Sequence, residues 1–232
     1  TAQMSPEQAK VYEATMMRLR QRVDSIVKEK GFERGRTEVL AAITQLREIC
    51  CHPSLVLDDY TGTSGKLDML LDMLPEAIAK GRRVLLFSAF TSMLKILRRE
   101  LDDAGYETMY LDGDTPAQRR VEMAEQFKAG QGQIFLISLK AGGTGLNLTG
   151  ADMVIHYDPW WNPAAEDQAT DRAYRIGQTR KVEVIRLVTH ASIEEQVVAL
   201  GQRKKALFDQ LIKPGESMVG GLSPQEIMSL FQ

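Results

Sequence analysis

The chain has 232 residues, of which 44 % are hydrophobic and 26 % are charged, and its 29 basic and 31 acidic residues give a formal net charge of −2. This composition is typical of a globular protein and excludes collagens, disordered tails and small disulfide-rich proteins. A net charge near zero also argues against a chain that is basic throughout and binds nucleic acid by overall charge.

The sequence carries no membrane or export signal. No apolar stretch approaches the roughly 18 to 20 residues that span a bilayer, and the first residues lack the basic-then-apolar order of a signal peptide. These features predict an intracellular protein with no membrane partner. Cys50 and Cys51 are adjacent, and no second cysteine cluster is present to complete a zinc site or a disulfide framework. We therefore expect two reduced, buried thiols and no metal site.

Two helices are predicted in the first part of the chain. Apolar residues recur at helical spacing from Ser5 to Lys30, after a capping signal, and a glycine-containing break at 31–35 follows. A second helix is predicted from Thr37 to Cys50, and Pro53 prevents it from continuing further. The polar stretch 58–65 is predicted to be a linker.

From residue 66 onward, helical patterns alternate with short apolar strands, which is typical of a parallel sheet. Helices are expected over 66–79, 91–103, 115–128 and 163–174, and strands over 83–88, 107–111, 133–139, 153–156 and 182–188. A long helix from Ser192 to Ile212 and a short capped helix from Ser223 follow. The prediction is an α/β fold, an open parallel sheet with helices on both faces and helical appendages at both ends.

Glycine and polar residues follow the predicted strand 133–139, and ligands of such sheets bind at the carboxyl ends of strands. Backbone N–H groups in Gly142–Gly145 could approach an anion, and Lys140 and Thr144 could add a charge and a hydroxyl. A purely structural turn is the alternative. The spacing disfavours a dinucleotide-binding fingerprint, because Leu148 stands where glycine or alanine is required. A Walker A motif is also missing from the sequence.

A second polar cluster lies in the predicted helix 163–174. Gln168, Arg172 and Arg175 lie four and seven residues apart, so they are expected to share one face of that helix. Two guanidiniums aimed in one direction can grip the oxygens of a phosphate chain. The alternative is a pair of surface arginines that form ion pairs with neighbouring aspartates.

Five segments form a set when they are taken in chain order, namely 84–88, 111–115, 138–148, 157–163 and 168–178. Together they resemble the motifs of the second RecA-like lobe of SWI/SNF-type remodelling ATPases, which are helicase-like superfamily II translocases on double-stranded DNA. The most specific of them is Asp171–Gln178, in which Tyr174 stands where typical members have histidine. The resemblance extends over nearly the whole chain, since 46–53 is similar to the end of the family's helical protrusion and 191–212 to its brace helix.

The resemblance implies roles for individual residues. Arg172 and Arg175 match the arginine fingers that reach ATP held by the first lobe, and Gln168 lines the same face. Gly143 and Gly145, with Thr144, match the loop that couples the nucleotide to DNA, and Trp161 matches the tryptophan that couples ATP hydrolysis to movement. Contacts with DNA are implied for Phe87, Ser88, Gly113, Asp114, Thr115, Arg119, Lys140, Thr144 and Trp161.

The sequence contains neither the phosphate-binding lysine nor the Mg²⁺-binding acid pair of the family's first lobe. The resemblance therefore implies the second motor lobe of an ATP-dependent double-stranded DNA translocase that does not hydrolyse ATP by itself. Its expected cofactor is ATP with Mg²⁺, held mainly by the first lobe. Its expected partners are double-stranded DNA, the N-terminal RecA-like lobe of the same parent chain and other DNA-bound proteins.

Three parts are expected, namely a protrusion end and linker over 1–60, the RecA-like lobe over 61–190, and a brace helix and tail over 191–232. The two helical parts are expected to pack together, because each would otherwise expose an apolar face. A bacterial cytoplasm, at the nucleoid, is favoured over a eukaryotic nucleus.

Alternatives from other classes remain open. A stand-alone nucleic-acid or protein-binding module without ATPase activity is the main alternative. An RNA helicase lobe is disfavoured, because such a lobe carries His-Arg-x-Gly-Arg-x-x-Arg where this chain has Gln168–Arg175. A nicotinamide-dependent dehydrogenase is disfavoured by the spacing of the glycines in this chain.

Overall fold

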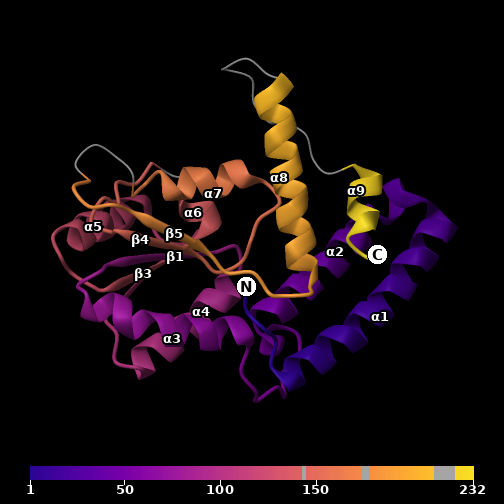
Figure 1. Ribbon diagram of the computed structural model, residues 1–232, viewed down its shortest axis with the longest axis horizontal. Coiled ribbons are helices and arrows are strands. Elements are labelled where there is room, and N and C mark those ends of the chain that lie inside the picture. Colours follow the sequence, from indigo (N-terminus) through magenta and orange to yellow (C-terminus); the bar gives the residue numbers. More distant parts are fainter. Residues whose placement is uncertain (143–144, 174–177, 212–222) are drawn as a thin grey trace.

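A parallel sheet is the centre of the computed structural model, which describes residues 1–142, 145–173, 178–211 and 223–232 and, within them, five strands (Figure 1). The strands are β1 (Val84–Ser88), β2 (Thr108–Leu111), β3 (Ile134–Ser138), β4 (Met153–His156) and β5 (Glu183–Arg186). Their order is β2-β3-β1-β4-β5, and every neighbouring pair is parallel. The predicted open parallel sheet is confirmed, and all its carboxyl ends meet at one edge.

Helices cover both faces of the sheet, as predicted. The helices are α1 (Pro6–Lys30), α2 (Phe32–Cys51), α3 (Gly65–Ala79), α4 (Thr91–Asp103), α5 (Ala117–Lys128), α6 (Leu139–Gly142), α7 (Pro163–Thr170), α8 (Ile193–Leu211) and α9 (Pro224–Ser229). Successive residues of a strand point to opposite faces. Leu86 accordingly packs in one core cluster with α3 and α4, whereas Leu85 packs in another with α5, α6 and α7 (Figure 1).

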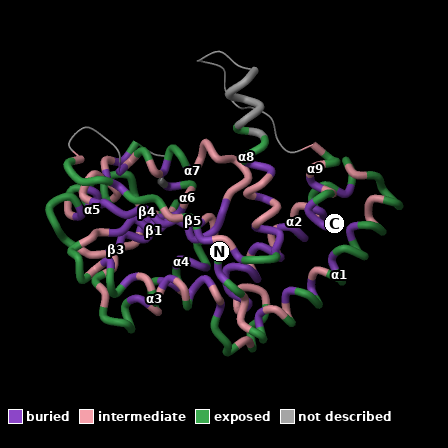
Figure 2. The backbone as a smooth tube through the Cα atoms, in the orientation of Figure 1, coloured by how far each residue is buried: buried purple, intermediate pink, exposed green. Residues whose placement is uncertain are grey.

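The helices α1, α2, α8 and α9, here called the helical module, share a third hydrophobic cluster that includes Leu46 and Val197. This confirms that the two ends of the chain pack together, and Figure 2 shows the buried stripes of these helices turned toward one another. Cys50 belongs to this cluster, whereas Cys51 packs in the cluster of α3 and α4. Burial raises the pKa of both thiols, so they remain protonated and unreactive.

The first helical hairpin differs from the prediction, because α2 begins at Phe32 and contains Gly35. The turn between α1 and α2 uses Gly31 alone, whose φ of 75° is a left-handed conformation that favours glycine. A Cβ at Gly35 would lie 2.3 Å from Cγ2 of Ile26. Gly35 therefore permits close packing of the two helices, and its interpretation as part of a break was wrong.

Two further features concern the chemistry the fold can support. Among the described residues, none of the helices is both long and apolar enough to pass through a membrane. Within the same ranges, His, Cys, Asp and Glu side chains do not gather in groups of three or more that could hold a metal ion.

Gly65 lies where α3 approaches the first residues of the chain. Its N–H donates to Oε1 of Gln8 at 2.9 Å, and a Cβ on it would lie 1.7 Å from the carbonyl oxygen of Gln3. Because the clashing atom belongs to the backbone, we expect Gly65→Ala to lower the free energy of unfolding by about 1 to 3 kcal/mol. Urea denaturation followed by circular dichroism measures this change. Gly113→Ala is the matched control, since no atom lies within 4 Å of a Cβ there, and equal losses in the two variants would contradict the prediction.

Candidate functional site

The predicted site residues follow the carboxyl ends of four strands. Ser88 ends β1, the stretch 113–115 follows β2, Lys140 follows β3 and Trp161 follows β4. Because all strands are parallel, these ends lie at one edge of the sheet, where ligands bind in open α/β folds. The fold therefore brings these four segments to the same side of the sheet.

The glycine-rich segment lies against the arginine-bearing segment. Helix α6 packs against α7, and the N–H of Leu148 donates to the carbonyl of Arg172 at 3.0 Å. Gly145 is exposed with a φ of 80°, and Gln168 and Lys140 are exposed as well. Arg172 is half-buried. The remaining predicted residues of this region, Gly143, Thr144, Tyr174 and Arg175, lie outside the described residues.

The helix that was predicted to carry the arginines is shorter than expected. α7 ends at Thr170, so the prediction that this helix extends to residue 174 was wrong. Gln168 lies in α7, whereas Arg172 lies after its end. The N–H of Ala173 donates to the carbonyl of Thr170 at 2.9 Å, three residues back, which is tighter than an α-helix. The carbonyl of Arg172 is already occupied by the N–H of Leu148. The N–H of Arg172 likewise donates three residues back, to Ala169, so the α-helical pattern ends at Thr170.

Gln178 is the last residue of the motif 171–178, and the sequence analysis gave it no role of its own. Its Nε2 donates to the carbonyls of Thr149 at 3.0 Å, Ala151 at 2.6 Å and Ala173 at 3.1 Å. One side chain therefore joins the segment after the arginines to the loop that precedes β4. Such contacts between distant parts of the chain leave no local spacing signal in the sequence.

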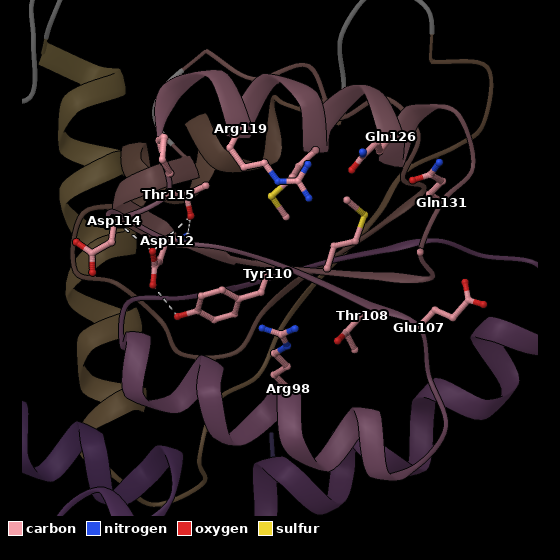
Figure 3. Close-up of a pocket in the computed structure, with 14 residues that line it drawn as sticks. Arg98, Glu107, Thr108, Tyr110, Asp112, Asp114, Thr115, Arg119, Gln126 and Gln131 are labelled. Carbon is pink, nitrogen blue, oxygen red and sulfur yellow. Dashed lines mark hydrogen bonds between the residues drawn. The ribbon is translucent and has the colours of Figure 1, made fainter.

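A groove of about 660 Å³ lies along β2, and three predicted DNA-contacting residues, Asp114, Thr115 and Arg119, line it. Figure 3 shows Arg119 on α5 and Arg98 on α4 on opposite sides of this groove. The neighbouring Gly113 is exposed. Both cationic side chains have acidic neighbours, since Arg119 lies 3.3 Å from Glu122 and Arg98 lies 3.6 Å from Asp102.

Asp112 organises the turn after β2. The sequence analysis implied roles only for the residues that follow it, 113–115. Its carboxylate accepts the hydroxyl of Tyr110 at 2.8 Å and the N–H of Asp114 at 3.0 Å, and its own N–H donates to Oγ1 of Thr115 at 3.1 Å (Figure 3). Burial and the adjacent Asp112 carboxylate raise the pKa of Tyr110 to about 12. The phenol therefore stays protonated and keeps donating to the turn.

The structure corrects the expectation of direct DNA contact for Phe87 and Ser88. Each is 1 % exposed, because β1 is a central strand with helices on both sides. The ring of Phe87 packs in the core, and the hydroxyl of Ser88 donates to the carboxylate of Asp158. Their side chains can affect a surface only by holding the loops that follow the strands.

The two tryptophans form a stacked pair after β4. Their ring centroids lie 4.1 Å apart with an interplanar angle of 24°, and both side chains are half-buried. The backbone N–H of Trp160 donates to Oε1 of Glu166 at 2.8 Å, which ties this loop to α7. Trp161 also packs against the core of the helical module. The pair thus bridges the sheet edge and the module.

His156, at the end of β4, provides a pH-sensitive contact beneath the site. Its Nε2 lies 2.9 Å from Oγ1 of Thr170, and its ring stacks on Phe87 at 5.5 Å. Burial, together with the nearby charge of Arg186, lowers the pKa of His156 from 6.5 to about 4.

We expect the free energy of unfolding to fall by up to about 3 kcal/mol between pH 6.5 and pH 4, because the unfolded imidazole binds a proton that the folded one does not. Urea denaturation across this range, on the unmodified chain and on His156→Gln, measures this contribution, which the substitution is expected to remove. His190→Gln, at an exposed position, is the control. An equally steep pH dependence in His156→Gln and the unmodified chain is the contrary result.

Comparison with known proteins gives consistent matches. The family model for the helicase conserved C-terminal domain matches residues 65–177. The Bacillus subtilis protein YwqA, whose name places it among ATP-dependent helicases or translocases, is 38 % identical over 98 % of this chain and 25 % of its own length. The Sulfolobus solfataricus SWI2/SNF2 ATPase core in complex with dsDNA superimposes with a TM-score of 0.77 and 33 % identity, over 99 % of this chain and 48 % of that one.

The C-terminal domain of the Sulfolobus solfataricus SWI2/SNF2 ATPase matches with a TM-score of 0.75 and 29 % identity, over 99 % of this chain and 94 % of that one. The chain spans a quarter or less of the length of the curated relatives compared, between 19 % and 25 %. These matches cover the parallel sheet together with the helical module. The chain therefore belongs to the SWI2/SNF2 family of superfamily II helicase-like ATPases, as the C-terminal lobe of that family.

Proposed function

We propose that this chain is the second motor lobe of an ATP-dependent translocase on double-stranded DNA. The observation that carries the proposal is that four loops with polar or aromatic residues meet at one edge of the sheet, in a chain of this family. A family member that is 33 % identical over 99 % of this chain was solved with dsDNA, which supports the choice of duplex as the track.

Arg172 and Arg175 act in this proposal as arginine fingers toward ATP that an N-terminal RecA-like lobe holds together with Mg²⁺. A planar guanidinium can stabilise the charge that develops on the transferred phosphoryl group. Gln168, Gly143 and Gly145 complete the nucleotide-facing surface. The described residues fit an anionic group, since exposed Lys140 and the backbone of exposed Gly145 lie on segments packed beside Arg172.

The DNA backbone is contacted, in this proposal, through the loops after β2, β3 and β4. Phe87 and Ser88 support these loops from within the core. The contacting residues are Gly113, Asp114, Thr115, Arg119, Lys140, Thr144 and Trp161. Because such contacts go to phosphates, binding is expected to tolerate changes of base sequence and to weaken as salt rises.

The proposal divides the chain into a motor lobe over 61–190, the end of a protrusion with a linker over 1–60, and a brace helix with a tail over 191–232. The shared core of the helical module supports a joint role for the two flanking parts. Other DNA-bound proteins are the proposed targets, and the bacterial nucleoid or the eukaryotic nucleus is the proposed location.

The experiment that tests this function is steady-state ATP turnover by a protein that joins this chain to its N-terminal lobe, with and without duplex DNA. Duplex is expected to stimulate turnover, and this chain alone is expected to show none, because arginines without a nucleotide cradle have no charge to stabilise. Turnover that ignores DNA would contradict the translocase and favour a binding module. Magnesium-dependent turnover by this chain alone would contradict the division of labour between lobes.

A further inference from the structure

A buried cation connects the helical module to the edge of the sheet. Arg47 lies four residues before Cys51, the last residue of α2, and Cys51 packs in one hydrophobic cluster with residues of β1, β3 and β4. The Arg47 side chain is 2 % exposed. Its Nη2 lies 3.3 Å from Oδ2 of Asp158 and donates to the carbonyl of Pro159 at 2.9 Å. A charge so far from water is retained only where it is paired and hydrogen-bonded.

Three aromatic rings enclose the same guanidinium. Its central carbon lies 5.1 Å from the ring centroid of Phe90, 4.9 Å from that of Trp160 and 5.7 Å from that of Trp161. These distances fall within the range of cation–π attraction. Phe90 belongs to the loop after β1, whereas the two tryptophans belong to the loop after β4. One side chain from α2 therefore contacts both loops at once.

Asp158 joins these two loops on the other side of the ion pair. Its carboxylate accepts the hydroxyl of Ser88 and the N–H of Ala89, the latter at 3.2 Å. Oγ of Ser88 in turn accepts the N–H of Phe90 at 3.1 Å. The polar and aromatic contacts of Arg47 therefore fix the loop after β1, the loop after β4 and the helical module in one arrangement.

A lysine at position 47 could keep the charge but not this arrangement. The guanidinium is planar, so it can stack on rings with its face while its edge donates to Asp158 and Pro159. An ammonium is a compact and strongly hydrated charge without such a face. The requirement for arginine is thus geometric. If the only task of residue 47 were to neutralise Asp158, lysine would serve as well.

We propose that Arg47 is a positioning residue for duplex binding, which holds Trp161 and the loop after β1 in the geometry that meets the DNA backbone. This inference rests on the proposed function. It gives α2 a part in shaping the DNA-facing surface, although none of the predicted contact residues belongs to this helix.

The test compares Arg47→Lys with the unmodified 232-residue chain in two measurements. Duplex affinity is measured by fluorescence anisotropy of a labelled duplex at fixed salt. Intrinsic emission reports on the cluster itself, because Trp160 and Trp161 are the two tryptophans of the chain. Arg47→Lys is expected to bind duplex about tenfold more weakly, a tenfold change being about 1.4 kcal/mol, and to shift the tryptophan emission.

Leu46→Ala is the matched control, since Leu46 precedes Arg47 in α2, is fully buried in the hydrophobic cluster of the helical module and makes none of the contacts described for the Arg47 guanidinium. It is expected to destabilise the chain while leaving duplex affinity and tryptophan emission unchanged under conditions where circular dichroism shows a folded protein. If Leu46→Ala weakens duplex binding as much as Arg47→Lys, Arg47 merely stabilises the fold and the inference is overturned.

If Arg47→Lys does not fold, Phe90→Leu is tested instead, because this substitution removes one aromatic ring and leaves the charge of Arg47 intact. Phe90→Leu is expected to weaken duplex binding and to shift the tryptophan emission in the same way. Wild-type duplex affinity in the folded variant overturns the inference and leaves the proposed function standing. Failure of the unmodified chain to bind duplex at all overturns the proposed DNA contact, and this inference with it.

Discussion

Replacing Arg175 by alanine is expected to lower duplex-stimulated ATP turnover by about 10³-fold, the loss typical of a missing arginine finger. The protein to use is one that joins this chain to its N-terminal lobe, assayed at saturating ATP and duplex. The reason is that a guanidinium acts mainly on charge that develops in the transition state, so its removal lowers kcat more than it weakens ATP binding. Arg172→Ala is expected to act in the same direction.

Arg18→Ala is the matched control, because Arg18 is an exposed arginine of α1 and lies outside the proposed site. Its turnover is expected to equal that of the unmodified protein. Retention of turnover by Arg175→Ala to within about threefold, compared with the roughly 10³-fold loss of a finger, is incompatible with the assignment.

Replacing Lys66 by methionine is expected to lower the free energy of unfolding by about 3 to 5 kcal/mol, because it leaves a buried carboxylate without its cation. The side chains of Lys66 and Glu194 are both fully buried, with Nζ 2.6 Å from Oε1. Nζ also donates to the carbonyl of Tyr157 at 2.9 Å, and Oε2 of Glu194 accepts the N–H of Thr189 at 2.8 Å. The pair thus joins α3, α8 and the end of β4.

Urea denaturation measures this loss, and two further variants define its cause. The double variant Lys66→Met with Glu194→Gln is expected to recover part of the stability, because the uncompensated charge is gone. Lys80→Met breaks a surface pair with Glu76, whose side chain is 75 % exposed, and is expected to cost less than about 1 kcal/mol. A loss in Lys66→Met as small as that in Lys80→Met would show that the buried pair does not hold these elements together.

The architecture was predictable because it rests on local patterns. Apolar strands that alternate with helical periodicity indicate a parallel sheet with helices on both faces, and the capping signals at Ser5 and Ser223 mark helix starts that the structure confirms. The resemblance to a known family located the loops at the sheet edge. It could not tell which side chains of those loops are exposed, and Phe87 and Ser88 are buried.

The contacts that position the site were not predictable, because they join residues far apart in the sequence. Arg47 and Asp158 are separated by 111 positions, and Lys66 and Glu194 by 128. Neither pair has a spacing that a helix or strand period could reveal. The end of α7 was also missed, because the change to hydrogen bonds three residues back after Thr170 leaves no mark in the helical spacing of the sequence.

The measurement that tests the central claim most directly is ATP-dependent displacement of a third strand from a linear duplex, by a protein that joins this chain to its N-terminal lobe. A motor that moves along duplex DNA is expected to displace the third strand when ATP and Mg²⁺ are present, at a rate that Arg175→Ala reduces in parallel with ATP turnover. A protein that binds the duplex and hydrolyses ATP but leaves the third strand in place would contradict translocation.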